Sequence, residues 1–359
     1  MSFSGPILLI VHPGALGDGL LALSALRVLQ VTFPGHRMIW FGHKELGDVL
    51  VDSQAVHQSH SFDRLGVLAY CGPNESQQGK ILSILRRCER AIAWLDDTEG
   101  IWRNWLRTAG VKNCILRSPH DPTLLNDHMA DRYVETLEPW VHTKQVLSDI
   151  ETKVKIGGFL VFSKSKSARI PCFIKEPLIV LHPGSGSRYK CASPGLWASI
   201  VNGLKIAQPY RKICLVGGPA DTDSLRNVQG LLTHHECTIL TGRDLLSVGQ
   251  YLQHAQLFIG HDSGLSHVAA SLGIPSVLLF GPTDPAKWAP RGTHVTVMQK
   301  SCFCLGKAAI DRCVDKRCLS IPSHEVLAKV EEVLCGVKPF ATPPAFGCVD
   351  VNLDVPCLG

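Results

Sequence analysis

The chain has 359 residues, of which 45% are apolar and 19% charged, and this composition suits a folded protein of two domains and excludes a disordered one. Its formal net charge of +5 is compatible with an anionic ligand or a membrane surface but is too small to indicate a nucleic acid as partner. The sequence has no apolar run near the roughly 20 residues of a membrane-spanning helix and begins without the features of a signal peptide, so we expect a cytoplasmic protein.

The first segment has the pattern of a strand, a glycine-rich turn and a helix. Residues 6–11 are apolar, residues 12–19 hold three glycines, and residues 20–33 have helical spacing. The turn lacks the G-x-G-x-x-G spacing and the downstream acidic residue of a dinucleotide site, which disfavours NAD. Asp18 stands where a helix begins and where an anion is stabilised, so it is either a helix cap or a site residue.

The first half continues with two runs that predict strands and two segments whose spacing predicts helices, at 38–41, 91–95, 101–109 and 127–140. The helix at 101–109 carries Arg103 and Arg107, which are candidates to contact an anionic acceptor, although a solvated helix face explains them equally well. Residues 141–176 are mixed and polar, and we place the boundary between the domains there.

The second half begins with the same pattern as the first. Residues 177–181 predict a strand, and HPGSGSRYK at 182–190 follows it as HPGALGD at 12–18 follows the first strand. Because the two halves open alike, we expect two related Rossmann-like domains that face one another.

Three later loops with glycine or aspartate, at 217–221, 262–267 and 281–284, also follow apolar, strand-like runs. The carboxyl ends of parallel strands meet at one edge of a sheet, so these loops and residues 182–190 should lie together. Open α/β sheets bind nucleotides and phosphates at this edge. The loop at 262–267 taken alone is compatible with an ordinary helix cap, and it is the convergence of four loops that favours a site.

The chain has fourteen cysteines, and a disulfide framework is not expected for a cytoplasmic protein. Four thiols form a group with the spacing C-x-C-x8-C-x4-C, at Cys302, Cys304, Cys313 and Cys318. Such a group is a candidate structural site for zinc or iron. Free or redox-active thiols remain the alternative, because the spacing is not that of paired C-x-x-C motifs.

Four segments of the chain resemble glycosyltransferase family 9, the ADP-heptose:lipopolysaccharide heptosyltransferases. They are GALGDGLLALSALRVL at 14–29, HPGSGSRYK at 182–190, LVGGPAD at 215–221 and GHDSGLSHVAASLGIPSVLLFGPTDP at 260–285. The resemblance implies a GT-B fold of the α/β class, in which two Rossmann-like domains enclose a cleft. It implies an acceptor-binding domain at 1–165, a nucleotide-sugar-binding domain at 175–322, and a helix and tail at 323–359, the helix packing back on the first domain.

The resemblance also assigns roles to single residues. Asp18 matches the proposed catalytic base, Lys190 matches the lysine of the donor phosphates, and Asp221 loosely matches an acidic residue that contacts the ribose. The D-[ST]-G-x-x-H donor motif is matched by Asp262, Ser263, Gly264 and His267. Further candidates are Ser185, Ser187 and Gly217 for the donor and Gly17, Arg103 and Arg107 for the acceptor.

The chain departs from the family pattern in two places. Lys190 is followed by Cys191, and Trp197 comes only after an insertion, whereas the family usually has a tryptophan close behind the lysine. The cysteine group resembles the cysteine motif of many members only loosely. The resemblance therefore does not fix the loop conformation around Lys190 or the presence of a metal.

The mechanism implied by the resemblance is inverting transfer of heptose from ADP-heptose to a lipopolysaccharide core acceptor. Asp18 would take the proton of the acceptor hydroxyl, while Lys190 and the backbone N–H groups near Ser263 would stabilise the departing diphosphate, without a catalytic cofactor. The expected partners are a nucleotide-sugar and a lipid-linked oligosaccharide or other glycan, with no nucleic acid. A peripheral contact with the inner membrane is left open.

Other functions stay open at this point. A family relative with another donor or with a protein acceptor, such as a protein heptosyltransferase, would have the same motifs. A nucleotide-sugar epimerase shares the two-domain shape and differs in its product. A non-catalytic sugar-binding relative would tolerate the loss of Asp18, which this chain retains.

Overall fold

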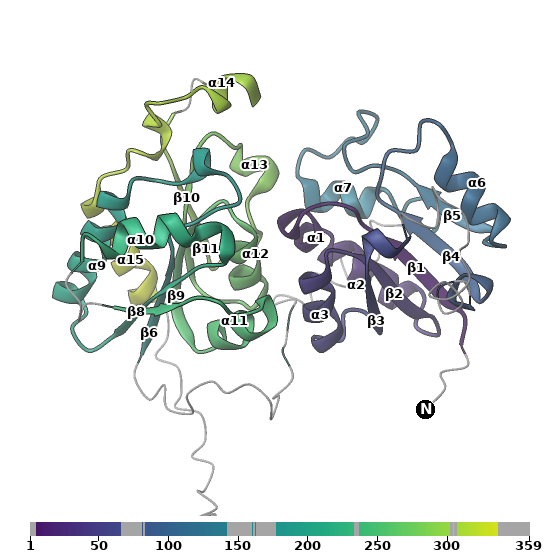
Figure 1. Ribbon diagram of the computed structural model, residues 1–359, viewed down its shortest axis with the longest axis horizontal. Helices are drawn as coiled ribbons and strands as arrows, with labels where there is room; N and C mark the ends of the chain where they lie inside the picture. The colour runs from purple at the N-terminus through teal and green to yellow at the C-terminus, as the bar shows by residue number, and fades with distance from the viewer. Residues whose placement is uncertain are drawn as a thin grey trace, which may run out of the picture.

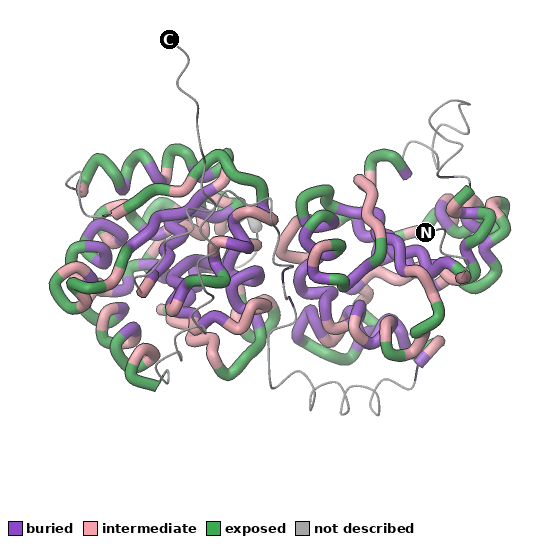
Figure 2. The backbone as a smooth tube through the Cα atoms, turned by 90° about the horizontal axis from the view of Figure 1, so that it is seen from below, coloured by how far each residue is buried: buried purple, intermediate pink, exposed green. Residues whose placement is uncertain are grey.

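The computed structural model describes residues 5–65, 81, 83–141, 160, 162, 177–232, 237–301, 304 and 307–336. These residues form two parallel β-sheets, each covered by helices, in two lobes that lie side by side (Figure 1). Buried residues follow the strands and the inward faces of the helices in both lobes (Figure 2). Within the part of the chain that the structure describes, no helix has both the length and the apolar content needed to cross a membrane.

The first lobe contains a five-stranded sheet with the order β3-β2-β1-β4-β5. Its strand pairs are parallel, and the central strand β1 is buried along its whole length because helices cover both faces of the sheet. The strands are β1 (Ile7–Val11), β2 (Arg37–Gly42), β3 (Gln58–Ser61), β4 (Cys88–Ala93) and β5 (Asn113–Leu116). The helices are α1 (Leu16–Leu21), α2 (Leu23–Thr32), α3 (Lys44–Asp52), α6 (Ile101–Thr108) and α7 (Met129–Glu135).

The second lobe contains a six-stranded parallel sheet with the order β11-β10-β9-β6-β7-β8. The strands are β6 (Leu178–His182), β7 (Lys212–Val216), β8 (Thr238–Leu240), β9 (Ala255–His261), β10 (Ser276–Phe280) and β11 (Val295–Gln299). The α-helices are α9 (Pro194–Ala207), α10 (Thr222–Gln229), α11 (Leu245–Leu252), α12 (Gly264–Ser271), α13 (Pro285–Trp288), α14 (Lys307–Asp311) and α15 (Ser323–Gly336). Three short 3-10 helices are η1 (Arg188–Lys190), η2 (Pro219–Asp221) and η3 (Arg317–Leu319).

Side-chain caps fix where the helices of the second lobe begin. The Ser193 side chain accepts a hydrogen bond from Leu196 N, and Pro194 occupies the first turn of α9. Asp244 caps α11 in the same way through Ser247 N. Ser263 caps α12 by accepting from Ser266 N, so the helix starts directly behind Asp262.

Two predicted helices differ from the structure. The helix expected over 20–33 is two helices, α1 and α2, which meet at Ala22. The helix expected over 127–140 is limited to α7, because Leu137, Glu138 and Trp140 donate to the carbonyl three residues before them and so form tighter turns.

The carboxyl-terminal helix α15 packs within the second lobe, so its expected return to the first domain is wrong. Val326 and Val330 are buried in one apolar cluster with side chains of α9. Leu327 lies against Gly203 of α9, where an added Cβ would be 2.3 Å from Leu327 Cδ1. The apolar face of α15 therefore packs against α9 at this glycine. The domain limits at 165 and 175 stay predictions, because residues 163–176 fall outside the described residues.

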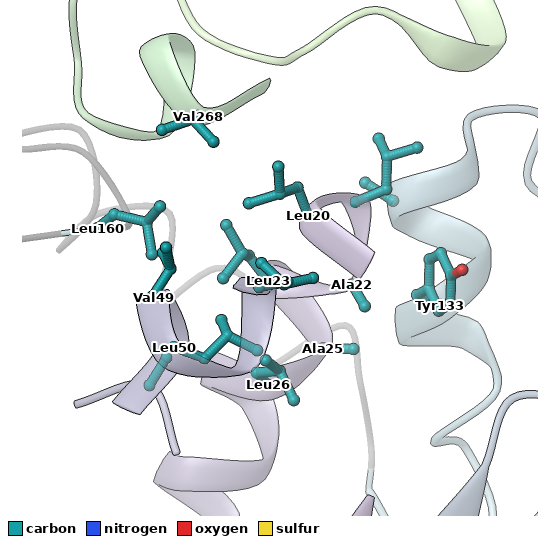
Figure 3. Packing of buried hydrophobic residues seen from close by; sticks show 14 of the residues in the cluster. Leu20, Ala22, Leu23, Ala25, Leu26, Val49, Leu50, Tyr133, Leu160 and Val268 are labelled. Atoms are coloured by element: carbon teal, nitrogen blue, oxygen red, sulfur yellow. The ribbon is translucent and has the colours of Figure 1, made fainter. Parts of the chain in front are cut away.

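The two lobes meet through facing helices, and an apolar cluster continues from one lobe into the other. In Figure 3, Leu20 and Leu23 of the first lobe lie below Val268 of α12, with Leu160 beside them. A cluster shared by both lobes holds the start of α1 opposite the start of α12.

Polar contacts add to this apolar contact between the lobes. Arg291, behind α13, forms a two-pronged ion pair with the carboxylate of Asp131 in the first turn of α7. His128 Nε2 donates a hydrogen bond of 2.9 Å to the carbonyl oxygen of Ala289. These contacts connect α7 with the segment behind α13.

Candidate functional site

Asp18 lies in the first turn of α1, on the side of the first lobe that faces the second. Its Oδ2 accepts a long hydrogen bond of 3.3 Å from Ala15 N, so the residue does cap its helix. The neighbouring Gly17 faces α12, where Gly264 Cα and His267 Cδ2 are each 3.9 Å from the position of an added Cβ. The first glycine turn therefore stands opposite the start of α12 in the other lobe, as expected for two lobes that face one another.

Behind Asp18 lies a buried pair that the sequence analysis missed. A hydrogen bond of 2.8 Å joins His12 Nε2 and the hydroxyl of Tyr133 on α7. Burial lowers the pKa of His12 to about 4, and burial together with the negative charge of Asp18 raises the pKa of Tyr133. The His-Pro-Gly sequence repeated at both lobe starts was the only signal for His12.

Two loops of the second lobe converge on Asp262, which lies in a third loop. The ammonium nitrogen of Lys190 lies 2.6 Å from Asp262 Oδ2, and the hydroxyl of Thr283 donates to the same oxygen at 2.7 Å. The Ser185 hydroxyl donates to the carbonyl oxygen of Asp262 at 2.8 Å. Lys190 has 30% of its side chain accessible, against 8% for Asp262. The exposed cation is therefore the group available to an anionic ligand.

The fourth loop contributes Asp221, whose carboxylate is turned toward the protein. Its Oδ2 accepts from His182 Nε2 at 3.1 Å and from Gly218 N at 2.8 Å. Burial alone would raise the pKa of Asp221, but the hydrogen bond and charge of His182 and the hydrogen bond from Gly218 N act together to lower the pKa. A Cβ at Gly184 would lie 1.9 Å from Asp221 Oδ1, and one at Gly217 would lie 2.9 Å from its Cβ. Both glycines are thus needed to seat this carboxylate.

The start of α12 is surrounded by neutral histidines. His267, at the end of the D-[ST]-G-x-x-H match, is buried, and burial lowers its pKa to about 4. His261 at the end of β9 is fully buried, which lowers its pKa to about 3. Its Nδ1 donates to the Gly184 carbonyl at 3.2 Å and its Nε2 accepts from Ala192 N at 2.9 Å. His261 therefore ties both ends of the loop that carries Lys190, a role the sequence analysis did not assign.

Similarity to known proteins agrees with this geometry. The profile of glycosyltransferase family 9 (heptosyltransferase) matches residues 106–313, which is more than half of the chain. The chain belongs to glycosyltransferase family 9. Lipopolysaccharide heptosyltransferase 3 of Escherichia coli is 31% identical to it over 167 residues, which are 45% of this chain and 48% of that protein. The chain thus spans about half the length of the curated relatives it matches.

Solved structures of other proteins share the fold of the chain. ADP-heptose LPS heptosyltransferase II of Escherichia coli has a TM-score of 0.68 at 19% identity, covering 92% of this chain and 98% of that one. A family 9 glycosyl transferase of Veillonella parvula has a TM-score of 0.68 at 17% identity, covering 94% and 99%. The predicted GT-B arrangement of two Rossmann-like domains is confirmed.

The family 9 acceptor candidates on α6 are not brought to the site. Arg103 and Arg107 are both exposed, and α6 lies beside β5 at the end of the first lobe that is remote from the second (Figure 1). Asp97 accepts from Trp102 N and Arg103 N and so caps α6. These arginines therefore form an outward-facing basic surface, separate from Asp18.

The cysteine group lies beside the Lys190 loop. Cys304, Cys313 and Cys318 line a small cavity together with Tyr189 and Pro282, while Cys302 falls outside the described residues. Hydrogen bonds from the backbone of Lys316 and from the Cys304 side chain lower the pKa of Cys313. Among the described residues, no group of three metal-binding side chains has the geometry of a metal site.

A second cavity lies behind the same loop, on the face of the sheet covered by α9 and α10. Cys191, Ser193, Trp197, Asn227 and Lys316 are among its lining residues, and Asp18, Asp262 and His267 are not. The candidate site therefore rests on the convergence of loops and lobes, and not on the size of a cavity. Ser187, the last donor candidate, caps η1 by accepting from Tyr189 N.

Proposed function

We propose that the chain is an inverting glycosyltransferase that moves heptose from ADP-heptose to a lipopolysaccharide core acceptor. The observation that carries the proposal is the opposition of Asp18, at the start of α1, to the start of α12, beside which Lys190 pairs with Asp262. The donor and acceptor classes come from the relatives, one named a lipopolysaccharide heptosyltransferase and one an ADP-heptose LPS heptosyltransferase.

The donor would bind at the carboxyl edge of the second sheet. The ammonium of Lys190 and the positive end of the α12 helix dipole offer positive potential to a diphosphate. These groups stabilise the charge that develops on the departing ADP, so the proposed mechanism requires no catalytic cofactor. His267 stays neutral beside them because it is buried, and we propose that it contacts the donor without carrying charge.

Asp18 would act from the opposite wall as the general base. It takes the proton of the acceptor hydroxyl while that oxygen forms a bond to the anomeric carbon and the bond from this carbon to the ADP oxygen breaks. Attack from the side opposite the leaving group inverts the anomeric centre. The proton of the hydroxyl ends on Asp18, and ADP leaves with the bonding electron pair.

The remaining assignments extend the same proposal. We propose an acceptor domain at 1–165 and a donor domain at 175–322, with α15 and the tail at 323–359 attached to the donor domain. The exposed Arg103 and Arg107 would contact a distant anionic part of the acceptor or the inner membrane surface on the cytoplasmic side. Flotation with vesicles containing anionic lipid tests the membrane contact. The unchanged protein should float with the vesicles, and the double variant Arg103→Gln, Arg107→Gln should stay behind.

A structural zinc or iron ion is proposed for the cysteine group. Cys304, Cys313 and Cys318 meet at one small cavity, and three thiolates with a fourth from Cys302 would complete a tetrathiolate set. Elemental analysis of protein purified without chelators decides the question. About one equivalent of zinc or iron supports the site. Protein that still binds ADP but contains neither metal would contradict it.

Product analysis tests the main proposal. Mass spectrometry of a reaction with ADP-heptose and a truncated lipopolysaccharide core should show a heptose added to the acceptor and free ADP. An isomerised nucleotide-sugar without a glycoside would indicate an epimerase. Donor binding with no product on any glycan or protein acceptor would indicate a sugar-binding relative.

A further inference from the structure

Lys316 lies in the cysteine-rich segment and reaches into the loop that carries Lys190. Its Nζ donates to the carbonyl oxygen of Arg188 at 2.7 Å and to that of Cys191 at 3.2 Å. Arg188 is the first residue of the one-turn helix η1, Lys190 is the last, and Cys191 follows it. The ammonium of Lys316 therefore joins the beginning and the end of the turn that presents Lys190.

Lys316 makes this contact from an uncommon backbone conformation. Its φ of 45° and ψ of 37° lie in the left-handed region, which residues with a Cβ rarely adopt. Gln54 is the only other non-glycine residue with positive φ among those described. Such a conformation persists where the surroundings enforce it, and it frequently marks a functional position.

The segment behind Lys316 is anchored beneath another donor loop. Cys318 and Leu319 are buried, and Leu319 N donates to the Lys316 carbonyl at 2.9 Å. Leu319 packs under Gly281, where an added Cβ would lie 3.1 Å from its Cδ1. Lys316 thus connects the 188–191 turn to the 281–284 loop, whose Thr283 also bonds to Asp262.

We infer that Lys316 is a positioning residue for the donor site, holding the Arg188–Cys191 turn so that Lys190 projects toward Asp262 and the bound diphosphate. The inference rests on the proposed function, since it deepens the account of the same donor site. Because both acceptors of Lys316 are carbonyl oxygens, its positive charge also remains beside the turn and adds to the potential felt by the diphosphate.

Three substitutions at Lys316 separate the effect of its ammonium group from the effect of its backbone conformation. Lys316→Met removes the donor group and its charge but keeps the length of the side chain. Lys316→Gly also removes them while favouring the left-handed backbone, so it relieves strain. Lys316→Arg keeps a cation with several donors. Arg317→Gln is the matched control, because Arg317 is exposed, belongs to the same loop and pairs with Asp315 instead of the turn.

Calorimetric titration of the full chain with ADP is the experiment. We expect Lys316→Met and Lys316→Gly to weaken ADP binding about tenfold, the effect of losing hydrogen bonds to a charged group. Lys316→Arg should recover most of the affinity, and Arg317→Gln should bind as the unchanged protein does. In turnover assays the two weakened variants should raise KM for ADP-heptose more than they lower kcat, because Lys316 does not touch the reacting atoms.

The outcomes are distinct. If Lys316→Gly binds ADP as tightly as the unchanged protein, the ammonium is not needed and the inference is overturned. If Lys316→Met unfolds, the comparison of Lys316→Gly with Lys316→Arg still decides, because glycine eases the backbone at this position. If the unchanged protein itself binds no ADP, the proposed function fails and the inference falls with it, whereas unaltered binding in the variants defeats the inference alone.

Discussion

The ammonium of Lys190 lies 2.6 Å from Oδ2 of Asp262, and the two residues are 72 positions apart in the sequence. This pair joins the loops behind β6 and β9, which are neighbouring strands of one parallel sheet. The same Asp262 oxygen also accepts from Thr283 in the loop behind β10. A partly exposed cation is thus held in place by a buried carboxylate that has a second donor.

Lys190→Met should weaken ADP binding by about ten- to a hundredfold, because a charged hydrogen-bond donor to the diphosphate is lost. Calorimetry with ADP measures the effect. Lys44→Met is the matched control, since Lys44 forms an exposed ion pair with Asp48 in the first lobe. Equal ADP affinity in both variants would show that Lys190 does not contact the phosphates.

Asp18→Asn should lower kcat by at least about a hundredfold while ADP affinity changes little. Asparagine keeps the size of the side chain and an oxygen that can accept from Ala15 N, but it cannot accept a proton. Asp223→Asn removes a carboxylate from the first turn of a helix outside the site and serves as control. Turnover close to normal in Asp18→Asn would reduce Asp18 to a helix cap.

Gly264→Ala should destabilise the contact between the lobes by about 1–3 kcal/mol, because the new methyl would lie 2.6 Å from Leu16 Cδ2 and 3.2 Å from its Cβ. Gly17→Ala faces the same contact, but its methyl would have no neighbour closer than 3.9 Å. Thermal unfolding of the two variants compares them directly. The steric argument is refuted if Gly264→Ala unfolds at the temperature of Gly17→Ala.

Stability should fall on acidification below neutral pH. Burial lowers the pKa to about 4 for His12, about 3 for His261 and about 4 for His267. In the unfolded chain these histidines have a pKa near 6.5, so below that pH the unfolded state binds protons that the folded state does not bind. The stability is therefore complete above about pH 6.5 and is lost progressively as the pH falls toward 4. The free energy of unfolding measured with urea should be lower at pH 5 than at pH 7 by about 2 kcal/mol per histidine. Equal free energies at the two pH values would contradict the buried neutral state.

Local sequence patterns predicted much of the fold because strands and helix starts are specified by nearby residues. The apolar run before His12 and the run before His182 each form the central part of a parallel sheet. Ser263 caps α12 as its position in the Asp-Ser-Gly turn indicated. The convergence of Lys190 and Asp262 also followed, because the ends of neighbouring parallel strands must lie at one edge.

Other features depended on which surfaces pack together, and only the tertiary structure decided them. The pairing of His12 with Tyr133 spans 121 positions and requires α7 to lie over β1. The packing of α15 on α9, with Leu327 against Gly203, joins segments that are far apart in the sequence. The reach of Lys316 into the Arg188–Cys191 turn depends on a backbone conformation that its own side chain disfavours. The sequence by itself determined the buried central strands and the glycine turns behind them, since these follow from local spacing and residue type. The partners of buried polar groups and the contacts between distant segments came from the packed fold, because burial and close approach are properties of the whole chain.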